Sequence, residues 1–77
     1  MKKKKVFETE DYLGAVIVLE NYLEGALADF EEGSIENDLC IEHSINALEL
    51  LTFSMLGISS ANDYRKRYEK AKAERRD

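Results

Sequence analysis

The residues in this chain whose types could carry metal or nucleophilic chemistry are Cys40 and His43. They stand three residues apart, so in a helix they occupy neighbouring positions on one face. A thiolate and an imidazole at this spacing can ligate zinc together or act as a nucleophile with its base. Structural zinc sites normally contain two such ligand pairs, whereas this chain has one cysteine and one histidine. We therefore predict that Cys40 packs as a small apolar residue, with no metal, cofactor or catalytic role.

Three carboxylates, Glu20, Glu24 and Glu31, form a second candidate site on the first expected helix. At 100° per residue they lie within about 40° of one another around the helix axis. No residue near them in sequence would desolvate them and raise a pKa, as acid–base chemistry requires. We interpret them as an acidic face that binds a basic protein surface, such as a groove that normally holds nucleic acid. The alternative is that basic side chains of the third helix fold back and neutralise this face.

The rest of the sequence lacks the residue sets on which most catalytic sites are built. It contains no glycine-rich phosphate loop, no G-x-S-x-G turn and no serine, histidine and aspartate set. One domain of bare helices also leaves little room for a cleft of several hundred Å3. The sequence predicts a protein that is not an enzyme.

Charge is segregated along the chain, whose formal net charge is −5 at pH 7. All eleven lysines and arginines lie in Lys2–Lys5 or in the stretch from Arg65 to Arg76. Between Val6 and Asn62 there are twelve acidic residues and no lysine or arginine. This pattern predicts an acidic body with a basic arm at each end.

Length and cysteine content favour a small cytoplasmic domain. A core built from 77 residues contributes about 3 to 5 kcal/mol, so association with a second copy is an ordinary source of further stability. One cysteine excludes an intramolecular disulfide and fits a reducing compartment. The basic start is followed by acids where a signal peptide would be apolar. The longest uncharged apolar run, Tyr12–Leu19, is shorter than the roughly 20 residues that span a bilayer, so no membrane contact is expected.

Hydrophobic periodicity predicts an all-α fold, in which two long helices form an antiparallel hairpin. The first helix is expected to have its N-cap at Thr9 and to run to about Glu32. Gly33 then gives a short turn, and the second helix is expected from Ile35 to Leu56.

A shorter basic helix is expected at the C-terminal end. It should begin with a capping box of Ser60 and Asp63, and it should fray beyond Lys72, where no apolar side chain remains to be buried. The predicted organisation is a flexible basic arm over residues 1–8, a helical bundle over 9–71 and a frayed basic tail over 72–77.

The first expected helix carries an apolar stripe with heptad spacing, which predicts packing against a neighbouring helix. Its members are Tyr12, Val16, Leu19, Leu23, Ala26 and Phe30. A second line with similar spacing lies on roughly the opposite face. Its members are Gly14, Val18, Asn21 and Gly25. Two glycines on one face indicate either the close approach of another backbone or tolerated surface positions.

The second half of the second expected helix is hydrophobic on nearly every side. A helix of this kind, here from Ile45 to Leu56, is normally buried all round. One antiparallel neighbour can cover only one of its seams, so the rest requires the third helix or a second chain. We predict a homodimeric helical bundle whose interface includes Leu48, Leu51 and Met55.

Two functions are consistent with these features. The first is a small acidic inhibitor or adaptor without enzymatic activity, which binds another protein. Its composition is similar to that of small phage or mobile-element proteins that block host nucleases, such as anti-CRISPR proteins and nucleic-acid mimics; this similarity is one of composition only.

The second function is a DNA-binding transcriptional regulator. The turn Leu56–Ser59 followed by a basic helix is similar to a helix-turn-helix, in which Arg65, Lys66, Arg67 and Lys70 would contact phosphates and bases. An acidic body opposes the long-range attraction on which such binding depends. We therefore place this function second.

Overall fold

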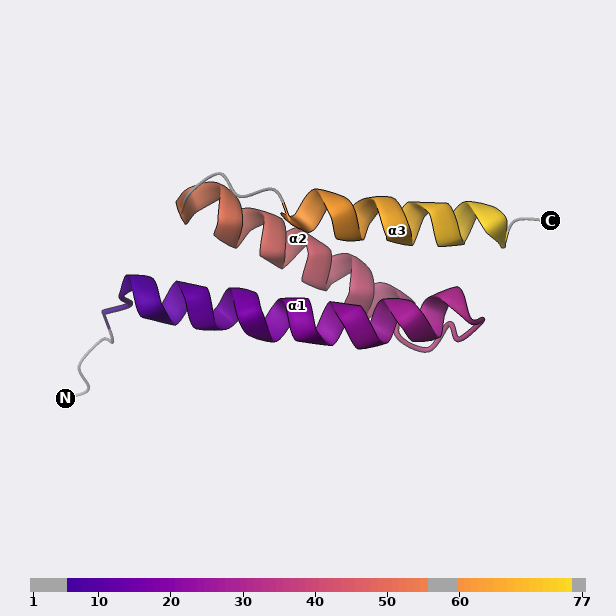
Figure 1. Ribbon diagram of the computed structural model, residues 1–77, viewed down its shortest axis with the longest axis horizontal. Coiled ribbons are helices and arrows are strands. Elements are labelled where there is room, and N and C mark those ends of the chain that lie inside the picture. Colours follow the sequence, from indigo (N-terminus) through magenta and orange to yellow (C-terminus); the bar gives the residue numbers. More distant parts are fainter. Residues whose placement is uncertain (1–5, 56–59, 76–77) are drawn as a thin grey trace.

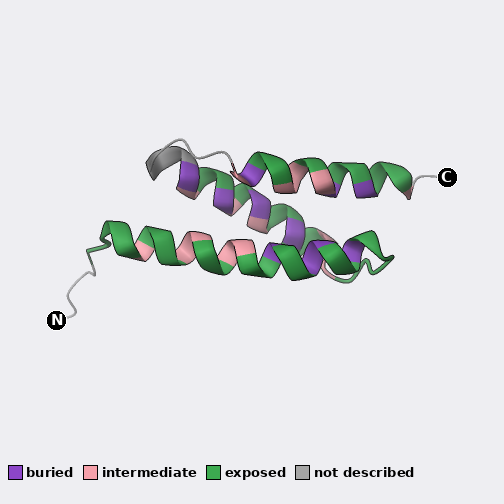
Figure 2. Cartoon of the chain, in the orientation of Figure 1, coloured by how far each residue is buried: buried purple, intermediate pink, exposed green. Residues whose placement is uncertain are grey.

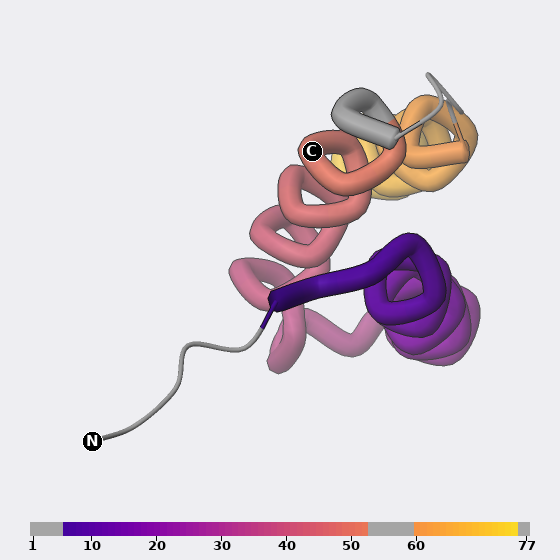
Figure 3. Tube along the Cα trace, turned by 90° about the vertical axis from the view of Figure 1, so that its left-hand side faces the viewer, coloured from indigo at the N-terminus to yellow at the C-terminus, as the bar shows by residue number. Residues whose placement is uncertain are grey.

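Three α-helices form the fold in the computed structural model, which describes residues 6–55 and 60–75 (Figure 1). They are α1, Thr9–Glu31, α2, Asp38–Met55, and α3, Ser60–Glu74. Within the described residues there is no β-strand, so the all-helical prediction is confirmed. From the end of α1 the chain leads back into α2, and α3 then runs in the same direction as α1 (Figure 1). Each helix contacts the other two, and α2 lies along one side of the pair α1 and α3 (Figure 3).

The start of α1 differs by one residue from the sequence prediction. Glu8 is the N-cap, and its backbone N–H donates a hydrogen bond of 2.9 Å to the Asp11 carboxylate. Thr9 is therefore the first helical residue and not the cap. Glu10 and Asp11 place negative charge in the first turn, where the helix dipole favours it. The basic arm at Lys2–Lys5 lies outside the described residues.

α1 ends at a turn that depends on Gly33. This residue has a φ of 121°, which strongly favours glycine. Its N–H donates to the carbonyl of Phe30 at 3.1 Å, and the N–H of Ser34 donates to the carbonyl of Asp29 at 3.0 Å. These two bonds form a Schellman motif, so the sequence located the turn correctly.

α2 begins three residues later than the prediction from Ile35. Residues 36–37 form a turn, and the first helical bond of this region joins the Ile41 N–H to the Asn37 carbonyl at 2.8 Å. Asp38, the first residue of α2, accepts a hydrogen bond from the hydroxyl of Tyr68 in α3. This start is therefore supported by a tertiary contact that local sequence rules do not contain.

The core lies where all three helices meet. Its buried apolar residues are Leu23, Ala26, Leu27 and Phe30 of α1, Ile41, Ile45 and Leu48 of α2, and Ala61, Tyr68 and Ala71 of α3. Figure 2 shows that the buried positions of α1 are confined to its C-terminal half. The predicted stripe of α1 is thus buried from Leu23 onward, whereas Tyr12 is exposed and Val16 and Leu19 are half-buried.

The two ends of α3 also differ from the sequence prediction. Ser60 is already helical where the described part of α3 begins, and its buried hydroxyl has no hydrogen-bond partner among the described residues, so it forms no capping box with Asp63. At the other end α3 continues two residues beyond Lys72. The guanidinium of Arg75 lies 3.8 Å from the centre of the Phe30 ring and stabilises this last turn by a cation–π contact.

Candidate functional site

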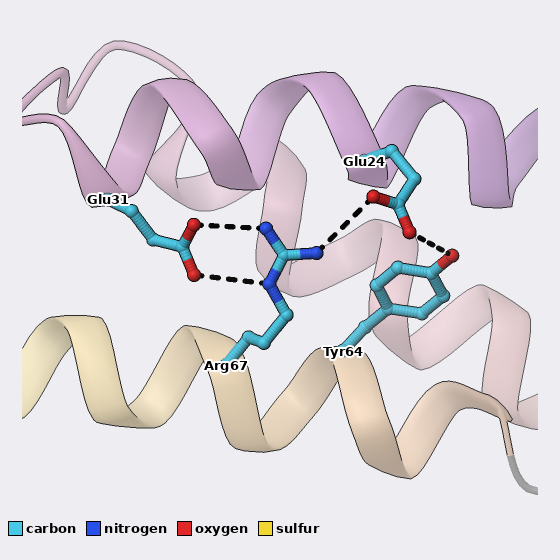
Figure 4. A network of polar contacts seen from close by, with 4 residues as sticks. All are labelled: Glu24, Glu31, Tyr64 and Arg67. Carbon is cyan, nitrogen blue, oxygen red and sulfur yellow. Dashed lines mark hydrogen bonds and ion pairs between the residues drawn. The ribbon is translucent and has the colours of Figure 1, made fainter.

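The acidic face of α1 is covered in part by α3 (Figure 4). The guanidinium of Arg67 donates to both carboxylate oxygens of Glu31, from Nε at 3.1 Å and from Nη2 at 3.0 Å. It also reaches Glu24 at 3.5 Å, and the hydroxyl of Tyr64 donates to Glu24 at 3.1 Å. The structure therefore has the second of the two arrangements considered, in which α3 folds back over these acids. Glu20 is half-buried and has no ion pair among the described residues.

These contacts change the protonation behaviour of the cluster. The hydrogen bonds from Arg67 lower the pKa of Glu31, and the same bonds raise the pKa of Arg67. Burial, with the hydrogen bond to Glu24, raises the pKa of Tyr64 to about 12. These shifts keep Glu31 and Arg67 charged and Tyr64 neutral at neutral pH. The cluster therefore joins α1 to α3, with the Glu31 carboxyl group held in its charged form.

Removal of one carboxylate tests this structural role. Glu31→Gln is expected to lower the free energy of unfolding at pH 7 by up to about 1 kcal/mol, since bidentate pairs at a partly exposed site are of modest strength. The folded-state pKa of Glu31 lies below its ordinary value of 4.5, so the advantage of the wild type is full above that pH and disappears as the pH falls through the folded value. Urea denaturation across acidic pH measures the difference.

Glu32→Gln is the matched control for this experiment. Glu32 is exposed, adjacent in sequence and without an ion pair in the described part of the chain. Equal losses of stability in the two variants at pH 7 would contradict a structural role for the Arg67 contact.

The predicted nucleic-acid residues divide into two groups. Arg65 binds Glu49 and donates to the Asn46 side chain of α2 at 3.1 Å, and Arg67 binds α1 as described. Lys66 and Lys70 are exposed. At 100° per residue their outward face also contains Asp63 and Glu69, which are exposed too. The turn Leu56–Ser59, on which the helix-turn-helix prediction depends, lies outside the described residues.

The three residues predicted at a dimer interface occupy different environments. Leu48 is 0% exposed and belongs to the core of the single chain, which removes it from any surface that a second copy could contact. Leu51 is half-buried and lines a pocket of about 340 Å3 at the start of α1, together with Phe7, Asp11, Tyr12 and Ala15. The side chain of Met55 lies outside the described residues.

Cys40 and His43 are both exposed, which corrects the prediction that Cys40 packs as a small apolar residue. Burial, with the neighbouring Cys40, raises the pKa of Tyr22. Within the described ranges, no three His, Cys, Asp or Glu side chains are grouped so that they could hold a metal ion. Among the described residues that line the pocket beside Leu51, Asp11 contributes a carboxylate and the others are apolar or aromatic.

A surface that the sequence did not reveal runs along the outward side of α2. Its residues, which we call the outer strip of α2, are Leu39, His43, Asn46 and Leu50. Leu39 and Leu50 are 64% and 70% exposed and lie about 16 Å apart along the helix. Ile35, just before the helix, is 68% exposed. The all-round apolar pattern had suggested that the later part of this helix was buried.

Two carboxylates lie near the start of this outer strip in sequence, one before α2 and one within its first turns. Glu36 and Glu42 are exposed, and no lysine or arginine of the described residues forms an ion pair with either. Exposed leucines beside unpaired acids resemble the centre and rim of a protein-binding surface.

Comparison of the chain with protein-family models, curated proteins and solved structures finds no match. No helix of the described residues combines the length and the apolar character that a membrane crossing requires.

Proposed function

We propose that this chain is an acidic protein-binding inhibitor or adaptor without enzymatic activity. The observation that carries the proposal is the outer strip of α2, where Leu39 and Leu50 are each more than three-fifths exposed. Large apolar side chains rimmed by polar residues are typical of binding surfaces. The sparse chemistry of the apolar pocket also favours binding over catalysis.

The partner that fits this surface is an amphipathic, basic segment of another protein. Its apolar side chains would cover Leu39 and Leu50, and its lysines or arginines would meet Glu36 and Glu42. Glu24 and Glu31 are bound by Arg67. We therefore assign the attraction of the basic partner to Glu36 and Glu42. A basic nucleic-acid-binding protein, such as a host nuclease met by a phage or mobile-element inhibitor, has segments of this kind. The single thiol at Cys40 fits a cytoplasmic location.

Regulation by DNA binding is the weaker candidate. Two of its four proposed contact residues, Arg65 and Arg67, are engaged by carboxylates of the same chain. Lys66 and Lys70 alone would give a small electrostatic contribution, because affinity for duplex DNA rises with the number of phosphates neutralised. Retardation of a DNA duplex that is lost on Lys66→Ala with Lys70→Ala would favour this function instead.

Selection from a displayed library of random helical peptides tests the main proposal. Peptides that bind the wild-type chain are expected to carry apolar residues at helical spacing together with lysine or arginine. Their binding should be lost in a variant with Leu39→Lys and Leu50→Lys, because two cations would replace the apolar contacts and repel the basic residues of the peptide.

The matched control places the same two charges on α1, as Ile17→Lys with Val18→Lys, and should retain peptide binding. The proposal fails if no peptide is enriched, or if the enriched peptides bind the α2 variant as well as they bind the wild type.

A further inference from the structure

A pocket lies where the start of α1 and the later part of α2 separate. Along its length α2 inclines away from α1 and toward α3, so the pair α1 and α2 opens at the end where α1 begins (Figure 1 and Figure 3). The volume of the pocket is about 340 Å3. A cavity of about 150 Å3 with apolar walls can bind benzene, so this pocket has room for a ligand about twice that size, such as two fused rings.

The walls of the pocket are mainly aromatic and aliphatic. Its lining residues are Phe7, Asp11, Tyr12, Ala15 and Leu51. The ring centroids of Phe7 and Tyr12 lie 6.3 Å apart, and the rings are tilted by 57°. The two residues are 59% and 38% exposed, so a ligand in the pocket would cover apolar surface that is otherwise open to solvent.

One wall of the pocket carries a carboxylate. Asp11 is half-buried, and its Oδ2 accepts the hydrogen bond from the Glu8 N–H at 2.9 Å. A carboxylate can accept about four hydrogen bonds, so it can bind the ammonium group of a ligand together with this N–H. The aromatic rings would add to the attraction, because a cation is stabilised over the face of an aromatic ring within about 6 Å.

The charge around the pocket favours a cation over an anion. The start of a helix carries about half a positive charge from its dipole, which alone would attract an anion. Glu8, Glu10 and Asp11 place three carboxylates in and just before the first turn of α1, and their combined charge outweighs the dipole. The lining residues all belong to the stretch Val6–Asn62, which contains no lysine or arginine.

We propose that this pocket binds a small aromatic ammonium ion. The rings of the ligand pack against Phe7, Tyr12 and Leu51, and its nitrogen donates to the carboxylate of Asp11. For a ligand of about twelve non-hydrogen atoms, contacts of this kind give a dissociation constant of about 0.1 to 1 mM. The pocket shares no residue with the outer strip of α2, so this inference does not depend on the proposed function.

A nuclear magnetic resonance titration with three probes tests the class of ligand. The probes are naphthylmethylammonium, the neutral naphthylmethanol and the anionic naphthoate, which share their rings and differ in charge. The amide signals of Asp11, Tyr12 and Leu51 should shift and saturate, and the affinity should fall at least about threefold from the ammonium to the alcohol and again to the carboxylate. No saturation by the ammonium up to about 10 mM, or equal affinities for the three probes, would overturn the proposal.

Asp11→Asn tests the role of the carboxylate. It keeps the shape of the side chain and an oxygen that can accept the Glu8 N–H, but it removes the charge. Binding of naphthylmethylammonium should weaken at least about threefold, whereas binding of the alcohol should stay unchanged. Glu10→Gln is the matched control, since it removes a charge that does not line the pocket, and it should change both affinities less than about twofold. Equal effects of the two variants on the ammonium would contradict the assignment of its nitrogen to Asp11.

Ala15→Phe tests the location of the site, because the added ring should fill the pocket and abolish binding of both the ammonium and the alcohol. Ala28→Phe adds the same ring at an exposed position of α1 and should leave binding intact. Circular dichroism confirms that both variants are folded; if Ala15→Phe is not, the comparison of Asp11→Asn with Glu10→Gln decides the outcome. Full binding by a folded Ala15→Phe chain would overturn the site.

Discussion

Replacement of Leu48 by alanine is expected to lower the free energy of unfolding by about 2 to 5 kcal/mol. Leu48 is completely buried between the three helices, so the change removes apolar contacts and leaves a cavity in a closely packed region. A domain of this size has a total core contribution of about 3 to 5 kcal/mol. Most of the variant should therefore be unfolded at ambient temperature, as measured by circular dichroism and urea denaturation.

Leu50→Ala provides a matched control for this experiment. It is the same substitution two residues further along α2, but Leu50 is 70% exposed. The free energy of unfolding should therefore fall by no more than about 0.5 kcal/mol. Comparable losses at the two positions would show that the core does not lie where the structure places it.

The fold is expected to lose stability steeply above about pH 10, because two tyrosines of α3 resist ionisation in the folded chain. Burial and the hydrogen bond to Glu24 raise the pKa of Tyr64 from 10.0 to about 12. Burial and the hydrogen bond to Asp38 raise the pKa of Tyr68 further. Between the unfolded and folded values the unfolded chain binds fewer protons, so the free energy of unfolding falls with rising pH. Below pH 10 the contribution is fully present.

The alkaline loss should become much shallower when both hydroxyls are removed by Tyr64→Phe with Tyr68→Phe. At pH 7 the double variant is expected to be less stable than the wild type by about 1 to 3 kcal/mol, because two hydrogen bonds to carboxylates disappear. Tyr12→Phe, at an exposed position, is the control and should keep the alkaline slope. Urea denaturation from pH 7 to 11 measures these effects, and an unchanged slope in the double variant would contradict them.

The parts of the fold that could be predicted from the sequence are those that local chemistry determines. Alternation of apolar and polar residues at helical spacing located all three helices, and Gly33 located the turn after α1 because only glycine readily adopts its backbone conformation. The C-terminal half of the stripe, from Leu23 to Phe30, is buried as predicted.

The parts that could not be predicted depend on contacts between residues far apart in the chain. Arg75 continues α3 past Lys72 because it packs on Phe30, forty-five residues earlier. From the sequence, Glu24 and Glu31 were interpreted as a binding face, whereas in the structure Arg67 of α3 contacts both of them. Charge and spacing alone left both arrangements open, because the long side chain of arginine can extend to either solvent or a carboxylate.

The hydrophobic periodicity also does not indicate which apolar positions are buried by other helices of the same chain. Both halves of the stripe of α1 satisfy the same heptad pattern, yet only the later half is fully buried, and Val16 and Leu19 of the earlier half are half-buried. For the same reason, Leu48 was predicted at an interface between two chains, although it lies in the core of the single chain. Burial has to be read from the packed structure before a binding surface can be assigned.

The most direct measurement of the packing is amide hydrogen exchange along α1. Leu23–Phe30 contains all the buried positions of α1, whereas no residue of Tyr12–Leu19 is buried. The amides of Leu23–Phe30 should therefore exchange more slowly than those of Tyr12–Leu19. Equal protection in the two halves of α1 would contradict the position of the core in this structure.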